Sequence, residues 1–331
     1  MPESFPGFYE RADLLLERPW EQHDPYSLDV PKHPRYLAYE QTNALDMLVT
    51  PTPSELQARM IRAYHEVKLA GIAPVLFIHA ESMQTEKTKN MKLFAWHMQQ
   101  QGRQVAFLIP QNGIGDENRG ETPGTGYIVS RAFAEKKTPA LVLTSNSLCH
   151  IKEQLAEKGI TSGNVEFICI DEVQLCTNQT HYEAIEGLLA LQLAGFTVVI
   201  NGIDYDFKAD IFTHMHHLLL MSRFLPGWKA FQLTTQCQHC SHPAHGSRRV
   251  IIFPDGRKQI ADATSPIVMP GLSNYYAVCD IFHKPCTRLA ATEVHVRPPL
   301  PTSLTLEQIQ QTPWMQETLA HFNINTGNTH L

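Results

Sequence analysis

Apolar runs alternate with helix-length segments through the middle of this 331-residue chain, and this alternation constrains its fold more than any other feature. Each run has a continuous apolar stretch and is long enough for a single strand: 75–80, 104–110, 140–145, 165–172 and 196–204. Segments with helical character separate most of them: 88–101, 148–159 and 182–195. Continuous apolar strands connected by helices predict a parallel sheet covered on both faces. The predicted fold class is therefore α/β.

Composition divides the chain into four predicted segments. Residues 1–72 form an N-terminal extension that is partly helical, with apolar positions at helical spacing over 54–69 and Gly71 as the stop. The α/β domain follows at 73–235, and a small lobe with cysteine pairs and short β-like runs occupies 236–290. Residues 291–331 hold a proline spacer and a helix near 305–322.

The bulk charge and hydropathy exclude several classes of protein. A formal charge of −6 argues against a nucleic-acid or anionic-membrane surface as the main function. No run of 18 apolar residues is present, and the first 20 residues lack the pattern of a signal peptide. We therefore expect a cytoplasmic protein that contacts neither membrane nor nucleic acid.

The stretch PVLFIHAESMQTEKTKNM, at 74–91, has the order of a phosphate-binding loop. An apolar strand leads into a short loop, and Lys87 and Thr88 then open a helix, as in the G-x-x-x-x-G-K-[ST] pattern. Glu81 and Glu86 stand where that pattern has glycines. The position before the lysine favours glycine, because the backbone there approaches phosphate in a conformation that L-residues disfavour. Glu86 therefore predicts weakened binding of a triphosphate.

Two adjacent acids end the strand FICIDEVQL. Asp171 and Glu172 would lie at the carboxyl edge of the sheet, where α/β proteins bind ligands. Asp171 could organise Mg²⁺, and Glu172 could take a proton from a hydroxyl nucleophile. The alternative is that both acids cap the following helix.

Four cysteines fall into two close pairs, Cys237 with Cys240 and Cys279 with Cys286. The C-x₂-C spacing of the first pair is typical of a structural Zn²⁺ site, which needs four ligands. The fourth ligand is either His283 or Cys286, and incidental cysteines are the alternative to any metal. The histidines His239, His242 and His245 are surface residues or alternative ligands, and the run HMHH at 214–217 predicts a solvated helix face.

These pieces, in this order, resemble the type II thymidine kinases from about residue 74 to 286. IDEVQL resembles the family's D-E-x-Q-F strand end, and INGIDYDFKADIF is similar to its following strand and loop. CQHCSHPAHGSRR is similar to its zinc segment, IVMPGLSNYYAVC to the lasso that folds over the base, and YIVSRAFAEKKTPAL to the segment after its flexible loop. The resemblance implies a P-loop-type parallel sheet flanked by helices, with a small zinc-binding lasso lobe.

The resemblance implies an ATP:pyrimidine deoxynucleoside phosphotransferase with thymidine as the expected acceptor, which would supply DNA precursors. Glu172 would be the general base, and Arg131 would stabilise the transferring phosphoryl group. Thr85, Lys87 and Thr88 would bind phosphate, and Asp171 with Thr88 would hold Mg²⁺. The implied nucleoside-binding residues are Met83, Leu175, Phe207, Ser247, Val268 and Tyr275. Zn²⁺ would join the lasso ends through Cys237, Cys240, Cys279 and His283 or Cys286, in a homo-oligomer of the family's tetrameric kind.

Several positions depart from the family pattern. Leu175 replaces a usual Phe, Tyr205 stands where a small residue is frequent, and Phe282 occupies the place of the family's second closing ligand. Glu86, Leu175 and the added terminal segments favour an alternative: a degenerate thymidine-kinase-like module that binds a nucleotide or, through its terminal extensions, a protein partner. A zinc-stapled scaffold without a small-molecule site is the third hypothesis.

Overall fold

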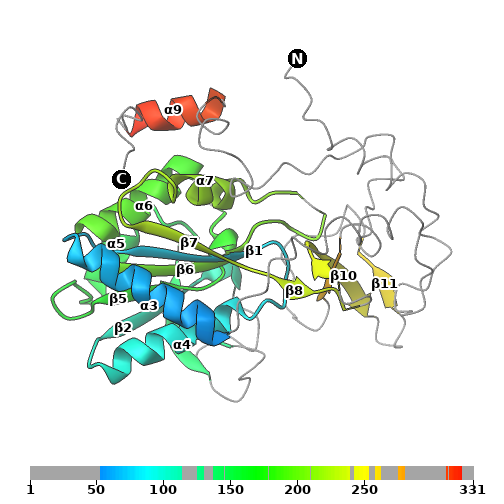
Figure 1. The fold of residues 1–331 in the computed structure, drawn as a ribbon, viewed down its shortest axis with the longest axis horizontal. Helices are drawn as coiled ribbons and strands as arrows, with labels where there is room; N and C mark the ends of the chain where they lie inside the picture. The colour runs from blue at the N-terminus through cyan, green and yellow to red at the C-terminus, as the bar shows by residue number, and fades with distance from the viewer. Residues whose placement is uncertain are drawn as a thin grey trace.

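A seven-stranded sheet forms the centre of the protein in the computed structural model (Figure 1). The structure describes residues 53–113, 125–129, 137–144, 146–177, 179–208, 210–238, 242–252, 258–261, 275–279, 311 and 313–322. The strand order is β3-β4-β2-β5-β6-β1-β7. The strands are β1 (Val75–Ala80), β2 (Val105–Pro110), β3 (Thr125–Ile128), β4 (Thr138–Leu143), β5 (Phe167–Ile170), β6 (Thr197–Ile203) and β7 (Trp228–Leu233).

Every neighbouring pair in this sheet is parallel except β3 with β4. The expected α/β class and mostly parallel sheet are therefore confirmed, with two differences. The sequence interpretation placed no strand at β7, which pairs with β1 at one edge of the sheet, and it did not foresee the antiparallel strand β3 at the other edge. Both differences lie at edges, where the apolar pattern is shorter and interrupted by polar residues.

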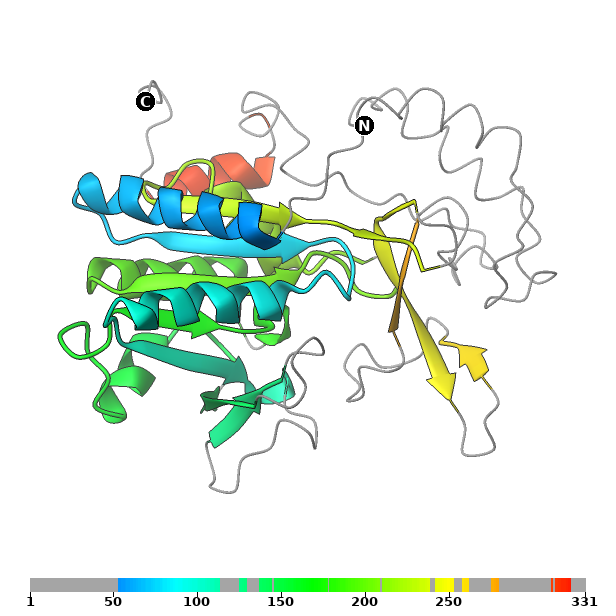
Figure 2. The ribbon, with the colours of Figure 1, turned by 60° about the horizontal axis from the view of Figure 1, so that its bottom comes forward.

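Helices cover both faces of the sheet, as expected. On one face, α3 (Pro53–Leu69) and α4 (Lys87–Gln100) lie side by side, and their buried side chains form a common core with β1, β2 and β5 (Figure 2). The other face carries α5 (Ile151–Glu157), α6 (His181–Leu193), α7 (Thr213–Met221) and α9 (Pro313–His321). The amide of Gln57 on α3 donates to the carbonyl of Asn90 on α4 at 2.9 Å, which joins the first pair.

Helix α3 is part of the folded core although it belongs to the predicted N-terminal extension. Leu56 and Met60 are fully buried, and Tyr64 donates a hydrogen bond to Glu166, just before β5, at 2.9 Å. Glu166 also pairs with Arg103 at 2.9 Å and Lys68 at 3.4 Å. This carboxylate therefore joins α3 to the start of β5, while the domain boundaries themselves stay a prediction.

A small β lobe continues from β7 beyond the carboxyl edge of the sheet (Figure 1). Its strands are β8 (Thr235–Gln236), β9 (Pro243–Ala244), β10 (Gly246–Ile252), β11 (Lys258–Ile260) and β12 (Tyr275–Val278). Strand β10 pairs antiparallel with both β11 and β12, and β8 pairs with β9. Among the described helices, none is long and apolar enough to cross a bilayer.

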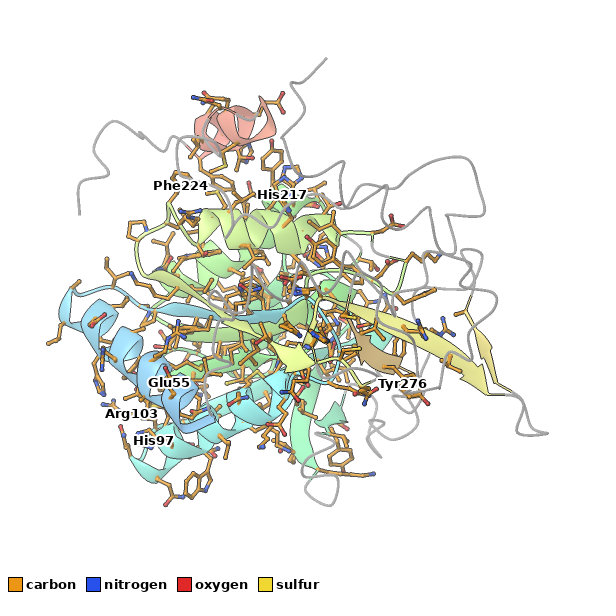
Figure 3. All side chains as sticks on the ribbon, turned by 45° about the vertical axis from the view of Figure 1, so that its right-hand side comes forward. Glu55, His97, Arg103, His217, Phe224 and Tyr276 are labelled. Atoms are coloured by element: carbon orange, nitrogen blue, oxygen red, sulfur yellow. The ribbon has the colours of Figure 1, made fainter. Side chains whose placement is uncertain are left out.

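The histidines of α7 overturn one expectation. The run at 214–217 is helical, as predicted, but His214 is 9% exposed and His217 is 7% exposed, so the helix face is not solvated. The His217 ring stacks on His181 of α6 at 3.9 Å, and Figure 3 shows it on the side of the molecule where α9 lies. On α9, His321 stacks on Tyr182 at 4.5 Å. His214 lies 3.1 Å from the carbonyl oxygen of Val173, and His217 stacks on α6, so the burial depends on partners that a local pattern does not reveal.

Burial lowers the pKa of His217 to about 4 and that of His216 to about 4. The unfolded chain therefore binds protons more readily than the folded chain between about pH 6.5 and pH 4, so the free energy of unfolding falls as pH drops through this range. We expect His217→Phe to keep the ring stack and to recover roughly 2–3 kcal/mol of that acid-dependent loss. Urea denaturation at pH 7 and pH 4.5 measures this change in the free energy of unfolding. Exposed His65→Phe is the control, and equal acid loss in both variants would contradict the assignment.

Candidate functional site

Strands β1, β6 and β5 lie next to one another, so the residues that follow them meet at one edge of the sheet. This carboxyl edge is where open α/β sheets bind ligands. The loop 81–86 follows β1, Asp171 and Glu172 follow β5, and Asp204 follows β6. Buried His79 and Asp204 join the ends of β1 and β6 through a contact of 3.0 Å between His79 Nδ1 and Asp204 Oδ2.

The backbone of the loop 81–86 confirms why glycine is favoured before the lysine. Glu86 adopts a left-handed conformation with φ 58° and immediately precedes α4. Gln84 is also left-handed, with φ 64°. An L-residue pays of order 1–3 kcal/mol to hold such a conformation. The Glu86 side chain is 45% exposed and pairs with Lys89 at 2.8 Å, so part of its charge is balanced within the first turn of α4.

The side chains that open α4 lie against the end of β5. Lys87 is 5% exposed, and its Nζ donates to Thr85 Oγ1 at 3.2 Å. Thr88 Oγ1 donates to Asp171 Oδ1 at 3.0 Å, with Oδ2 at 3.3 Å. The structure therefore brings together four of the predicted phosphate-binding and magnesium-binding residues.

Burial raises the pKa of Asp171 to about 7, and the neighbouring charge of Glu172 adds to the rise. Hydrogen bonds from Asn201 and Thr88 and the charge of Lys87 act in the opposite direction. A buried carboxyl beside a hydroxyl and a second carboxylate is a set of hard oxygen donors, which is the chemistry that Mg²⁺ prefers. The residues present fit that ion.

Glu172 is fixed by two residues that the sequence interpretation did not select. Its backbone is left-handed, with φ 53°, and its N–H donates to Asn201 Oδ1 at 3.1 Å. The side-chain amide of Gln174 donates to Glu172 Oε2, while Gln174 Oε1 accepts from the backbone of Ile203 at 3.3 Å. The Q of IDEVQL was the available signal for Gln174. For Asn201, a lone polar residue within an apolar strand was the signal.

The predicted nucleoside-binding residues divide between the sheet edge and the lobe. The N–H of Met83 donates to Ser247 Oγ on β10 at 2.8 Å. Phe207, 5% exposed, and Tyr275 on β12 both lie near the Arg249 guanidinium, with ring centroids at 5.4 Å and 5.9 Å. Arg249 is a further site residue that sequence reasoning missed, because only the fold shows that it lies between two aromatic rings.

Leu175 lies on a 3₁₀ turn, η5 (Val173–Leu175), directly after Glu172. Its carbonyl accepts a hydrogen bond from Asn112 Nδ2 at 3.4 Å, and its side chain lies beside Gly113. Tyr205, which also departs from the family pattern, is 1% exposed and bridges to Ile211. Its bulky ring is therefore buried in the core.

The described part of the lobe contains two of the predicted zinc ligands. Cys237 and Cys279 are both buried, at 3% and 4% exposure. Their segments are adjacent, because Gln238 donates through its N–H to the carbonyl of Ala277 at 3.0 Å. Among the described residues, no group of three or more His, Cys, Asp or Glu side chains could hold a metal. Arg131, Cys240, Val268, His283 and Cys286 lie outside the described residues, so the zinc site stays a prediction.

Comparison with known proteins supports the resemblance. The family model described as thymidine kinase matches residues 123–283. A thymidine kinase of Mesoplasma florum is 29% identical over 47% of this chain and 70% of its own length. A thymidine kinase of Mycoplasma mycoides is 29% identical over 38% of this chain and 54% of its own length. A thymidine kinase of Thermococcus kodakarensis is 32% identical over 40% of this chain and 59% of its own length. The matched part of the chain thus spans little more than half of two of these three relatives.

Among solved structures, AMPPCP-bound DnaA from Aquifex aeolicus is similar at 13% identity and a TM-score of 0.28, covering 66% of this chain and 52% of that one. A TM-score this low supports no argument about the fold, which rests on the strand order above.

The raised pKa of Asp171 has a testable consequence for stability. Between about pH 4 and pH 7 the folded chain binds this proton more readily than the unfolded chain, so the free energy of unfolding falls as pH rises through that range. We expect Asp171→Asn, which keeps an acceptor for Thr88, to gain stability over the parent as pH rises from 5 to 8. Urea denaturation at several pH values measures this, with exposed Glu153→Gln as the control. A difference independent of pH would contradict the assignment.

Proposed function

From the premise that this chain belongs to the thymidine kinase family, we propose that it is a thymidine-kinase-like phosphotransferase. The reaction is transfer of the γ-phosphoryl group of ATP to the 5′-hydroxyl of a pyrimidine deoxynucleoside, with thymidine as the favoured acceptor. The family implies that nucleoside and nucleotide bind.

One observation carries this proposal: the contact between Thr88 and Asp171, with Glu172 as the next residue. A hydroxyl at the start of α4, a buried carboxyl at the end of β5 and a second carboxylate beside it are the groups that phosphoryl transfer needs within one small volume. Lys87 and Thr85 complete the anion-binding side of the loop. A merely structural pair of acids that capped a helix would not require the buried Lys87 beside them.

In the proposed reaction, the 5′-oxygen of the nucleoside forms a bond to the γ-phosphorus, and the bond from that phosphorus to the β–γ bridging oxygen breaks. The proton of the 5′-hydroxyl passes to the carboxylate of Glu172, and ADP leaves with the bridging oxygen. Gln174 orients the carboxylate of Glu172 through its amide N–H. Lys87 and Thr85 bind the phosphate oxygens, and Arg131 stabilises the phosphoryl charge.

Two metals belong to the proposal. Mg²⁺, held by Asp171 and Thr88, supplies charge neutralisation for the phosphates when bound. Zn²⁺, held by Cys237, Cys240, Cys279 and either His283 or Cys286, joins the two ends of the lobe. The proposed nucleoside-binding residues are Met83, Leu175, Phe207, Ser247, Val268 and Tyr275. We also propose a cytoplasmic homo-oligomer.

The decisive test is formation of thymidine monophosphate from thymidine and Mg-ATP. We expect turnover by the parent protein, and a loss of roughly 10²–10⁴-fold in kcat for Glu172→Gln, because Gln cannot accept the proton. Exposed Glu157→Gln is the matched control and should keep parental turnover. If purified parent protein gives no monophosphate from any pyrimidine deoxynucleoside, the enzyme proposal fails.

The second candidate function is a nucleotide-binding or partner-binding module that has lost phosphoryl transfer. The left-handed Glu86 favours it, because a carboxylate before the lysine adds both backbone strain and repulsion of a triphosphate. The pairing of Glu86 with Lys89 limits the second effect, since the carboxylate charge is partly balanced.

Two substitutions of Glu86 separate strain from charge. Glu86→Gly relieves both, so we expect Mg-ATP to bind at least about 10-fold tighter by calorimetric titration of nucleotide-free protein. Glu86→Gln relieves only the charge and should give a smaller gain. If the parent protein is inactive and Glu86→Gly transfers phosphate to thymidine, the chain is a kinase that lost its activity through Glu86. If neither variant binds Mg-ATP, the phosphate site is lost and the partner-binding candidate stands.

A further inference from the structure

The loop between β1 and α4 contacts the lobe through the side chains of Glu81 and Gln84 and the backbone N–H of Met83. Glu81 stands where the phosphate-loop pattern has its first glycine. Its Oε2 lies 3.3 Å from His245 Nδ1, and its Oε1 accepts a hydrogen bond from Gln232 of β7 at 3.0 Å. The Glu81 side chain is 14% exposed. One carboxylate therefore joins the loop to both the sheet edge and the lobe.

Gln84 forms a second connection from the middle of the same loop. Its side-chain Nε2 donates to the carbonyl of Tyr275 on β12 at 2.6 Å, and its Oε1 accepts from Gln238, two residues after β8. The N–H of Met83, between the two, donates to Ser247 on β10. Three of the six loop residues are thus bonded to three separate segments of the lobe.

We propose that Glu81 and Gln84 are positioning residues that fasten the lobe to the phosphate loop, so that the two halves of the site move as one unit. The two halves of the site are named from the proposed function, on which this inference rests. The nucleoside half contains Ser247 and Tyr275, and the phosphate half contains Lys87 and Thr88. A loop held at both positions is already in place before the phosphate donor arrives, because the lobe contacts restrict its backbone.

The fastening has an energetic consequence for the two ligands. A nucleoside that orders the lobe also orders the loop, because the same bonds connect them, so the donor that binds second pays less for ordering. Binding of the acceptor nucleoside and of Mg-ATP is therefore positively coupled. Coupling between sites is usually about 5–150-fold in affinity and must be equal in both directions.

The first test needs no ligand. Hydrogen exchange of backbone amides is compared among the parent, Glu81→Gln, Gln84→Ala and the double variant. We expect the amides of Met83 and of β10 to exchange about 10-fold faster or more in the double variant, with β5 unchanged. Glu81→Gln keeps an acceptor for Gln232, so this variant isolates the loss of the His245 pair. Unchanged exchange at Met83 and β10 overturns the fastening, whatever the protein's activity.

Matched controls remove the same kinds of bond elsewhere. Gln57→Ala removes a side-chain hydrogen bond to α4 that does not involve the lobe. Glu166→Gln neutralises a carboxylate paired with Arg103 and Lys68. Neither should change exchange at Met83 or β10. Equal acceleration in a control would mean general loosening and would overturn the assignment to Glu81 and Gln84.

The second test measures coupling by titrating Mg-ATP, with a non-transferable analogue as the probe, in the presence and absence of thymidine. We expect the parental affinity ratio to fall toward 1 in the double variant and to stay parental in both controls. An equal ratio in parent and double variant overturns the coupling. A parent that binds neither ligand overturns the proposed function and the coupling that rests on it, while the exchange experiment separately decides the fastening.

Discussion

The hydrogen bond from Thr88 to the buried carboxyl of Asp171 joins the start of α4 to the end of β5, and the site depends on it. This bond is possible only because β1 and β5 both pair with β6, which brings their carboxyl ends to the same edge. Asn201 on β6 contributes by accepting from the backbone of Glu172. Strand order thus converts three distant sequence segments into one cluster of polar groups.

Residues with strained backbone conformations lie at the same edge of the sheet. Among the described residues other than glycine, four have positive φ, and three of them, Gln84, Glu86 and Glu172, belong to the site. Each costs of order 1–3 kcal/mol, which must be offset by surrounding contacts. Asn90 supplies one such contact, since both its backbone and its side chain donate to the carbonyl of Glu86.

Local pattern predicted the central strands and the polar residues that follow them, because a strand buried on both faces must be apolar along its length. It did not predict β7, whose exposed Lys229 and partly exposed Ala230 and Gln232 break the run. The buried positions of Arg249 and of the α7 histidines were not predicted for a different reason. Their burial depends on partners far along the chain: Phe207 and Tyr275 for Arg249, and Val173 and His181 for the α7 histidines. No local rule contains those partners.

Glu81 shows why a departure from a motif does not equal a loss. Judged against the pattern, a carboxylate in place of the first glycine only removes flexibility and adds charge. In the fold, that carboxylate accepts from Gln232 and pairs with His245, so its charge has partners on two elements. A glycine would leave the loop free to close around phosphate, whereas this loop is bonded to the lobe beforehand. Glu86 takes no part in the described bonds between loop and lobe. Its carboxylate pairs instead with Lys89 in the first turn of α4.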